Sequence, residues 1–121
     1  MSEAAPDIRV KRIYDAPERT DGARVLVDRL WPRGARKGEA RLTLWLKDIA
    51  PSDDLRRWFG HDPARFAEFS RRYRAELAAN KDAVGRLEEL VKVGPVSLLY
   101  AAHDAEHNNA RVLADYLKAR A

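Results

Sequence analysis

Residues 96–102, with the sequence VSLLYAA, limit the possible folds more than any other segment of the chain. They contain no charged residue, although charged residues make up 35% of the whole sequence. A strand that is buried on both faces has this composition, and such strands lie inside parallel sheets. We therefore predict that residues 96–101 form an interior strand of a mainly parallel sheet.

Three segments that precede this strand also have the composition of strands. Residues 8–14 are rich in β-branched and aromatic side chains, and residues 24–30 begin with an apolar run. Residues 42–47 alternate with the period of a half-buried strand. This alternation predicts two sets of side chains that point in opposite directions, Leu42, Leu44 and Leu46 toward a core and Thr43, Trp45 and Lys47 away from it.

Four helices are predicted from apolar residues at helical spacing and from residues that begin or end helices. Ser52 can cap the first helix and Gly60 can end it, while Asp62 followed by Pro63 can begin the second. The predicted helices span residues 53–59, 63–80, 81–93 and 108–119.

This order of elements is that of a small α/β domain with right-handed crossovers, because strands come first and a buried strand feeds the last helix. We predict a single domain over residues 8–121, with a mainly parallel sheet flanked by helices. A flexible N-terminus is expected at residues 1–7. An α+β arrangement is the alternative fold class.

Composition excludes several kinds of site. The sequence has no cysteine, which removes disulfides, thiolate nucleophiles and cysteine-bound metals. His103 and His107 lack a clear third ligand, so we predict no metal site and no cofactor. No apolar run is long enough to span a membrane, and we expect a cytoplasmic protein without membrane contact. The net charge of +4 favours acidic ligands weakly and is too small for a nucleic-acid-binding tail.

Polar and aromatic side chains follow several of the predicted strands. The carboxyl ends of parallel strands share one edge of a sheet, where ligands bind in open α/β folds. The N-terminus of the last helix adds N–H groups and a positive dipole. We therefore predict a basic, aromatic-lined pocket for a small anionic ligand, with Asp104 and His107 as candidate acid–base groups. The predicted ligand-binding residues are Asp28, Arg29, Trp31, Arg33, Trp45, Lys47, His61 and Asn108.

Several of these residues also have a purely structural interpretation. The tryptophans can be core residues with a satisfied indole N–H. Asp28 and its neighbour Arg29 can form an ion pair that holds a loop. Asp104 or Asn108 can simply cap the last helix.

Four ordered segments carry a resemblance to a known family: VLVDRLWPRG, LWLKDIAPSDDLRRWFGHDP, FAEFSRRYRAEL and VSLLYAAHDAEHNNARVL. Together they resemble the YeaO-like proteins, a bacterial group within the domain of unknown function 488 family, over residues 8–118. The matching motif residues include all ten candidate site residues. The family pattern implies lysine in many members where this chain has His103, which counts against an essential base there and favours a basic group of either kind near an anion. The resemblance implies no particular reaction.

Two functions from different classes fit this site. The first is an enzyme on a small phosphorylated or nucleotide-like substrate, in which Arg29 and Arg33 bind the anion and Asp104 or His107 transfers a proton. The second is a module that binds a nucleotide, or single-stranded nucleic acid stacked on the tryptophans, without catalysis. A structural or partner-binding role is a further alternative, and the sequence leaves the oligomeric state open.

Overall fold

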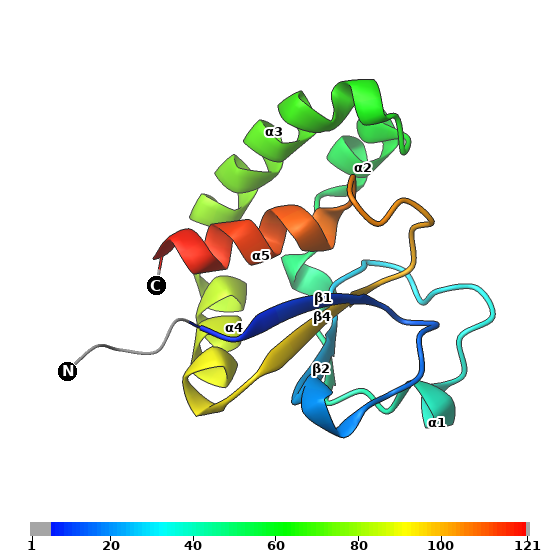
Figure 1. The fold of residues 1–121 in the computed structure, drawn as a ribbon. Coiled ribbons are helices and arrows are strands. Elements are labelled where there is room, and N and C mark those ends of the chain that lie inside the picture. The colour runs from blue at the N-terminus through cyan, green and yellow to red at the C-terminus, as the bar shows by residue number, and fades with distance from the viewer. Residues whose placement is uncertain (1–5, 121) are drawn as a thin grey trace.

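Four parallel strands form one sheet in the order β1-β4-β2-β3 in a computed structural model that describes residues 6–120 (Figure 1). The predicted α/β class with a parallel sheet is confirmed. Most of the N-terminal segment predicted to be flexible lies outside the described residues. The strands are β1 (Ile8–Arg12), β2 (Ala23–Leu26), β3 (Leu44–Trp45) and β4 (Val96–Tyr100).

Strand β4 lies in the interior of the sheet, which confirms the prediction for residues 96–101. It pairs with β1 on one side and with β2 on the other, so Leu98 is in register with both Val10 and Val25. All five residues of the strand are buried. The absence of charge in this segment follows from that position, because a charged side chain on either face would lose its hydration.

The helices begin and end close to the predicted residues, because local capping signals set their ends. The Leu55 N–H donates to Ser52 Oγ at 3.2 Å, and Gly60 ends the helix with a left-handed φ of 53°. Asp62 Oδ1 accepts the Ala64 N–H at 3.0 Å. The helices are α1 (Lys37–Ala40), which was not predicted, α2 (Asp53–Phe59), α3 (Phe66–Ala79), α4 (Lys81–Val93) and α5 (Asn109–Arg120).

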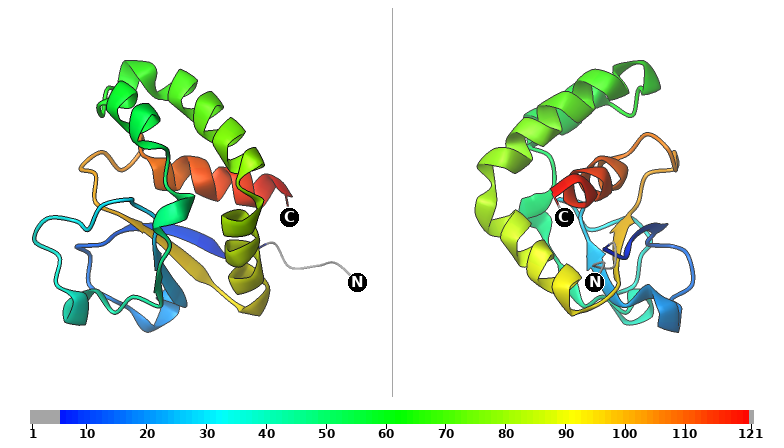
Figure 2. Two further views of the ribbon diagram at one scale, coloured as in Figure 1. Left: turned by 180° about the vertical axis from the view of Figure 1, so that it is seen from behind. Right: turned by 60° about the vertical axis from the view of Figure 1, so that its left-hand side comes forward.

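The two faces of the sheet are covered differently. Helices α2 to α5 gather on one face, where they build the main hydrophobic core with side chains such as Val25 and Leu98 (Figure 2). The other face is covered by the loops that follow β1 and β2, including α1. The buried residues on that face form a small group that we call the loop-side cluster, consisting of Ile13, Leu26, Ala40 and Leu99.

Strand β3 keeps part of the predicted alternation. Leu44 and Leu46 belong to the main core, whereas Trp45 packs against the loop-side cluster. The Lys47 Nζ lies 4.4 Å from the centroid of the Trp45 ring. The prediction that Trp45 and Lys47 point away from Leu44 and Leu46 is therefore confirmed.

The prediction that Leu42 shares the face of the other two leucines is wrong. Leu42 packs against the loop-side cluster, on the same side of the sheet as Trp45. The chain changes direction immediately before it, since Arg41 has a left-handed φ of 48°. The period of two therefore applies only from Leu44 onward, where the strand begins.

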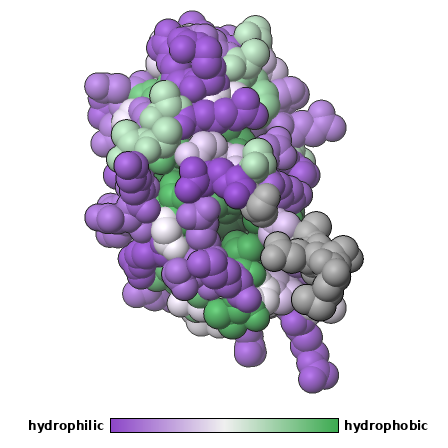
Figure 3. Space-filling view, turned by 90° about the vertical axis from the view of Figure 1, so that its left-hand side faces the viewer, coloured by the Kyte–Doolittle hydropathy of each residue, from purple (hydrophilic) through white to green (hydrophobic). Residues whose placement is uncertain are grey.

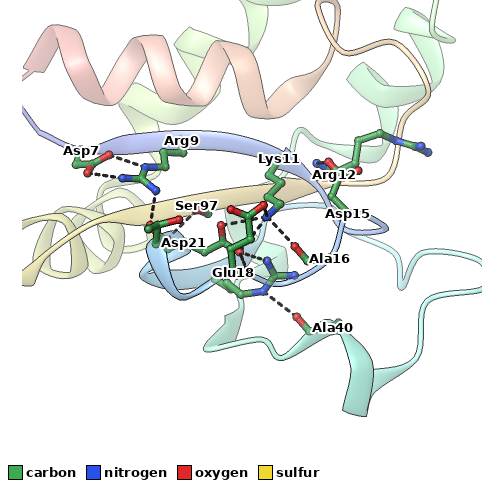
Figure 4. Close-up of polar contacts among 12 residues, drawn as sticks. Asp7, Arg9, Lys11, Arg12, Asp15, Ala16, Glu18, Asp21, Ala40 and Ser97 are labelled. Atoms are coloured by element: carbon green, nitrogen blue, oxygen red, sulfur yellow. Dashed lines mark hydrogen bonds and ion pairs between the residues drawn. The ribbon is translucent and has the colours of Figure 1, made fainter.

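A buried group of charges holds the crossover from β1 to β2 (Figure 4). Asp21, which is 3% exposed, accepts hydrogen bonds from Lys11 Nζ at 3.1 and 3.2 Å and pairs with Arg24. The Ser97 hydroxyl donates to the Asp21 carbonyl at 2.8 Å, and Arg24 Nε donates to the Ala40 carbonyl at 2.9 Å. Because buried charges are tolerated only with such partners, these contacts fix the amino ends of β2 and β4 against α1.

The described surface is largely hydrophilic. No helix within residues 6–120 has the length and hydrophobicity needed to cross a bilayer. Figure 3 shows mainly hydrophilic side chains on the side of the molecule where the two termini lie. Among the described residues, the large apolar side chains that stay exposed are Tyr14, Leu30 and Val93.

We expect Gly22→Ala to destabilise the fold strongly. Gly22 has a φ of 67°, and a Cβ atom there would lie 2.1 Å from the carbonyl oxygen of Pro95, which accepts the Ala23 N–H. The expected loss is at least about 2 kcal/mol of unfolding free energy, measured by urea denaturation. The control is Gly38→Ala in α1, where a Cβ meets no atom within 4 Å; it should change stability by less than about 1 kcal/mol. Equal losses in the two variants would contradict this account of Gly22.

Candidate functional site

A cavity of about 580 Å³ lies at the carboxyl edge of the sheet, where the segments after β2, β3 and β4 meet. Its volume is in the range of small-molecule sites. Six of the ten predicted site residues line it together: Asp28, Arg29, Trp31, His61, Asp104 and Asn108. The other four, Arg33, Trp45, Lys47 and His107, are not part of its lining.

Asp28 joins the ends of three elements at the wall of the cavity. Its Oδ2 accepts the Ala101 N–H at 3.0 Å, and its Oδ1 accepts the Asn109 Nδ2–H at 3.2 Å. Burial raises the pKa of Asp28, and the two hydrogen bonds and the charge of His61 oppose that rise. Within residues 6–120 no lysine or arginine forms an ion pair with Asp28, so the structural pair with Arg29 considered above is not present.

Arg29 turns its side chain toward the segment after β3. Its Nη2 donates to the Ala50 carbonyl at 3.1 Å and its Nε to the Pro51 carbonyl at 3.3 Å. Asp53 is the nearest carboxylate, at 3.9 Å. These bonds use two of the five N–H donors of a guanidinium, and the side chain remains 30% exposed. Arg29 therefore has a fixed orientation and keeps donors for a ligand.

Three further basic side chains line the cavity from other elements. Arg56 lies on α2, His61 follows that helix, and His103 follows β4; all three are exposed. Arg56 pairs with Asp53 at 3.3 Å on the surface of the helix. Together with Arg29, the basic groups come from three parts of the chain, which are the segment after β2, helix α2 with the turn that follows it, and the segment after β4.

His61 has an unusual backbone conformation. Its φ is 57°, and it follows Gly60, which is also left-handed with a φ of 53°. A residue with a Cβ pays about 1 kcal/mol for this conformation, although histidine enters it more readily than most residues. The two consecutive left-handed residues turn the chain sharply after α2, and this turn brings the imidazole to the cavity.

The apolar walls of the cavity include three aromatic rings beside smaller apolar residues. Phe59 and Phe69 stack with their centroids 4.2 Å apart on the side of α2 and α3. Trp31 also forms part of the wall, and its Nε1 donates to the Ala35 carbonyl at 2.8 Å. Trp45 packs against Trp31 in an edge-to-face contact of 5.4 Å. The Trp45 Nε1 donates to the Asp28 carbonyl at 2.8 Å, so Trp45 supports the wall from behind.

The segment between β4 and α5 is ordered by the Asp104 side chain. Asp104 Oδ1 accepts the N–H groups of Glu106 and His107 at 2.9 and 3.0 Å, and Oδ2 lies 2.8 Å from His107 Nδ1. The hydrogen bond from the Glu106 N–H, followed by the one from His107, lowers the pKa of Asp104. The carboxylate therefore holds a turn at the edge of the cavity.

Asn108 caps helix α5. Its Oδ1 accepts the Arg111 N–H at 3.0 Å and its Nδ2 donates to the Asp104 carbonyl at 2.9 Å. Asn108 is 2% exposed, so both ends of its amide are used within the protein. The His107 ring packs edge-to-face on Phe66 at 5.1 Å.

Two predicted basic residues point elsewhere. Arg33 is exposed on the turn after Pro32, and its carbonyl accepts the Tyr14 hydroxyl at 2.6 Å. Lys47 lies over the Trp45 ring, on the loop side of the sheet. Both belong to segments that adjoin the cavity, but neither side chain reaches its lining.

Several lining residues were not predicted from the sequence. Arg56, Phe59 and Phe69 reach the cavity only because α2 and α3 pack over the carboxyl edge of the sheet. Asn109 could have been found, because it stands next to Asn108 at the predicted start of the last helix. No group of three or more metal-ligating side chains occurs in the part of the chain that the structure describes.

Comparisons with known proteins match almost the whole chain. A family model described as "Inactive DUF488-N3 subclade" matches residues 7–121. The "Uncharacterized protein YeaO" of Escherichia coli (strain K12) is 45% identical over 112 residues, which cover 93% of this chain and 97% of that protein. The "Uncharacterized protein Rv3073c" of Mycobacterium tuberculosis (strain H37Rv) is 42% identical over 113 residues, which cover 93% of this chain and 95% of that protein. No solved structure matches.

The lowered pKa of Asp104 predicts how its turn responds to acid. Because the folded-state pKa lies below that of the unfolded chain, the carboxylate stabilises the turn above about pH 4. This contribution is lost as the pH falls through the folded-state pKa. We expect the amide proton shifts of Glu106 and His107 to titrate together in NMR spectra, with a midpoint below the ordinary 3.8. Asp104→Asn should abolish this titration, and a midpoint above 3.8 would contradict the hydrogen bonds described.

Proposed function

This chain belongs to the inactive DUF488-N3 subclade of the domain of unknown function 488 family, and from that premise we propose that it binds a small anionic ligand without catalysing a reaction. The resemblance to the YeaO-like proteins is confirmed by the match to the YeaO protein itself. The proposed site is the cavity at the carboxyl edge of the sheet.

The observation that carries the proposal is the combination of basic groups and apolar walls in one cavity. Arg29, Arg56, His61 and His103 supply cationic or hydrogen-donating groups, and apolar residues, including Trp31, supply most of the remaining wall. Guanidinium groups suit phosphate and carboxylate because their planar donors match paired oxygens. An apolar wall of this extent suits a ligand that also has a flat or hydrophobic body. A nucleotide or a phosphorylated metabolite has both parts.

The candidate acid–base groups argue against catalysis, because each already has a structural task. Asp104 holds the turn before α5, and His107 is bonded to Asp104 and packed on Phe66. Asn108 caps α5 with both ends of its amide. A general acid or base must also lie beside the ligand, and the His107 side chain does not line the cavity. The description of the subclade as inactive agrees with this interpretation.

Arg56 and Arg57 provide a matched test of the proposal. Both lie on α2 and form an exposed ion pair with the residue three positions earlier, but only Arg56 lines the cavity. A nucleoside monophosphate at about 100 times its dissociation constant should stabilise the protein by about 2.7 kcal/mol, a rise of several degrees in melting temperature. Arg56→Ala should reduce this rise by weakening the affinity severalfold.

Arg57→Ala is the control and should leave the rise unchanged. Neither substitution should alter the melting temperature without ligand by much, because exposed ion pairs contribute little. Equal effects of the two variants, or no rise with phosphate or any nucleoside monophosphate, would overturn the proposed site. Phosphorus NMR of the incubated nucleotides checks the second part of the proposal, since any turnover would show catalysis.

A further inference from the structure

Asp28 has hydrogen-bonding capacity that the fold does not use. Each of its oxygens accepts one N–H group, from Ala101 and from Asn109, whereas each oxygen of a carboxylate can accept two. The side chain is half-buried and lines the cavity. No ion pair within residues 6–120 neutralises it. A half-buried carboxylate with unused acceptor positions favours a ligand that donates to it over one that does not.

Asp28 and the two arginines of the cavity turn toward different segments. Asp28 faces the ends of β4 and α5, while the neighbouring Arg29 turns the opposite way, toward the segment after β3. Arg56 lies near Arg29, since both approach Asp53. A ligand with negative charge at both ends would be repelled by Asp28. The charges therefore fit a ligand with N–H donors at one end and an anion at the other.

We propose that Asp28 determines which ligand binds, by accepting two adjacent N–H donors of a flat heteroaromatic ring whose anionic group lies toward the arginines. This inference rests on the proposed function and names the ligand class for the same cavity. Guanine is the nucleobase with this pattern, because its N1–H and its 2-amino group point the same way from one edge. The free acceptor positions of Asp28, one on each oxygen, match that pair of donors.

The aromatic walls support a flat ring in this position. Trp31 packs against the loop-side cluster and Phe59 and Phe69 belong to the main core, so these rings reach the cavity from different faces of the sheet. An aromatic ring between such walls gains both burial and favourable ring contacts. The phosphate of a guanosine monophosphate would then be left for Arg29 and Arg56.

Calorimetric titration of the unchanged protein with GMP, IMP and AMP tests the inference directly. The three compounds share the ribose and the phosphate. IMP lacks only the 2-amino donor, and AMP places the N1 acceptor toward the carboxylate. GMP should bind about tenfold more tightly than AMP, with IMP between them. Equal affinities would overturn the role of Asp28 and leave the proposed function standing. No binding by any of the three would also overturn the inference, and the proposed function would fall with it if phosphate and the pyrimidine nucleoside monophosphates bind no better.

Asp28→Asn adds a change of preference that a merely structural role would not produce. An asparagine offers one acceptor and one donor, which matches the N6–H and N1 edge of adenine. The variant should lose affinity for GMP and bind AMP at least as tightly as GMP. A uniform loss for all three nucleotides would contradict the inference. Ribose 5-phosphate is the control in both proteins, and its weak binding should not change with the substitution.

Discussion

The burial of β4 on both faces and along both edges sets the arrangement of the elements around it. Val96–Tyr100 have neighbours on every side, with β1 and β2 in the plane of the sheet, helices on one face and loops on the other. The backbone is therefore free to carry polar groups only where the strands end. At the carboxyl edge the segments after three strands meet, and several of their polar side chains surround a cavity.

The polar groups around the cavity serve the fold and the site at the same time. Arg29 binds the carbonyls of Ala50 and Pro51, and Asp28 binds the Ala101 N–H, so each side chain ties together backbone segments that lie far apart in the sequence. Such cross-links remove the conformational freedom that a binding site otherwise loses when a ligand arrives. The fold itself therefore fixes the positions of these two side chains at the cavity.

The sequence predicted those parts of the structure that depend on neighbouring residues. Ser52 and Gly60 bound α2 because capping is local, and the uncharged segment of β4 reveals its position without knowledge of its partners. The face of Leu42 was predicted wrongly because the left-handed residue before it is Arg41, and the sequence has no glycine or asparagine there that would indicate a turn. A cavity lies at the edge of the sheet where the sequence predicted a site. Phe69 was assigned only to the core, since its approach to the cavity depends on how α3 packs on the rest of the fold.

Because the two faces of the sheet are covered unequally, the segments on the two faces should differ in local stability. The loop-side cluster has four buried residues, and short segments rather than long helices cover it. The amide protons of these segments should therefore exchange through local unfolding, at a lower free energy than those of the helices on the other face. Trp31 packs in that cluster and also lines the cavity. A ligand that contacts Trp31 would therefore raise the free energy needed to open these loops. Amide protons of the loop-covered face that lie far from the cavity would then exchange more slowly when the ligand is bound.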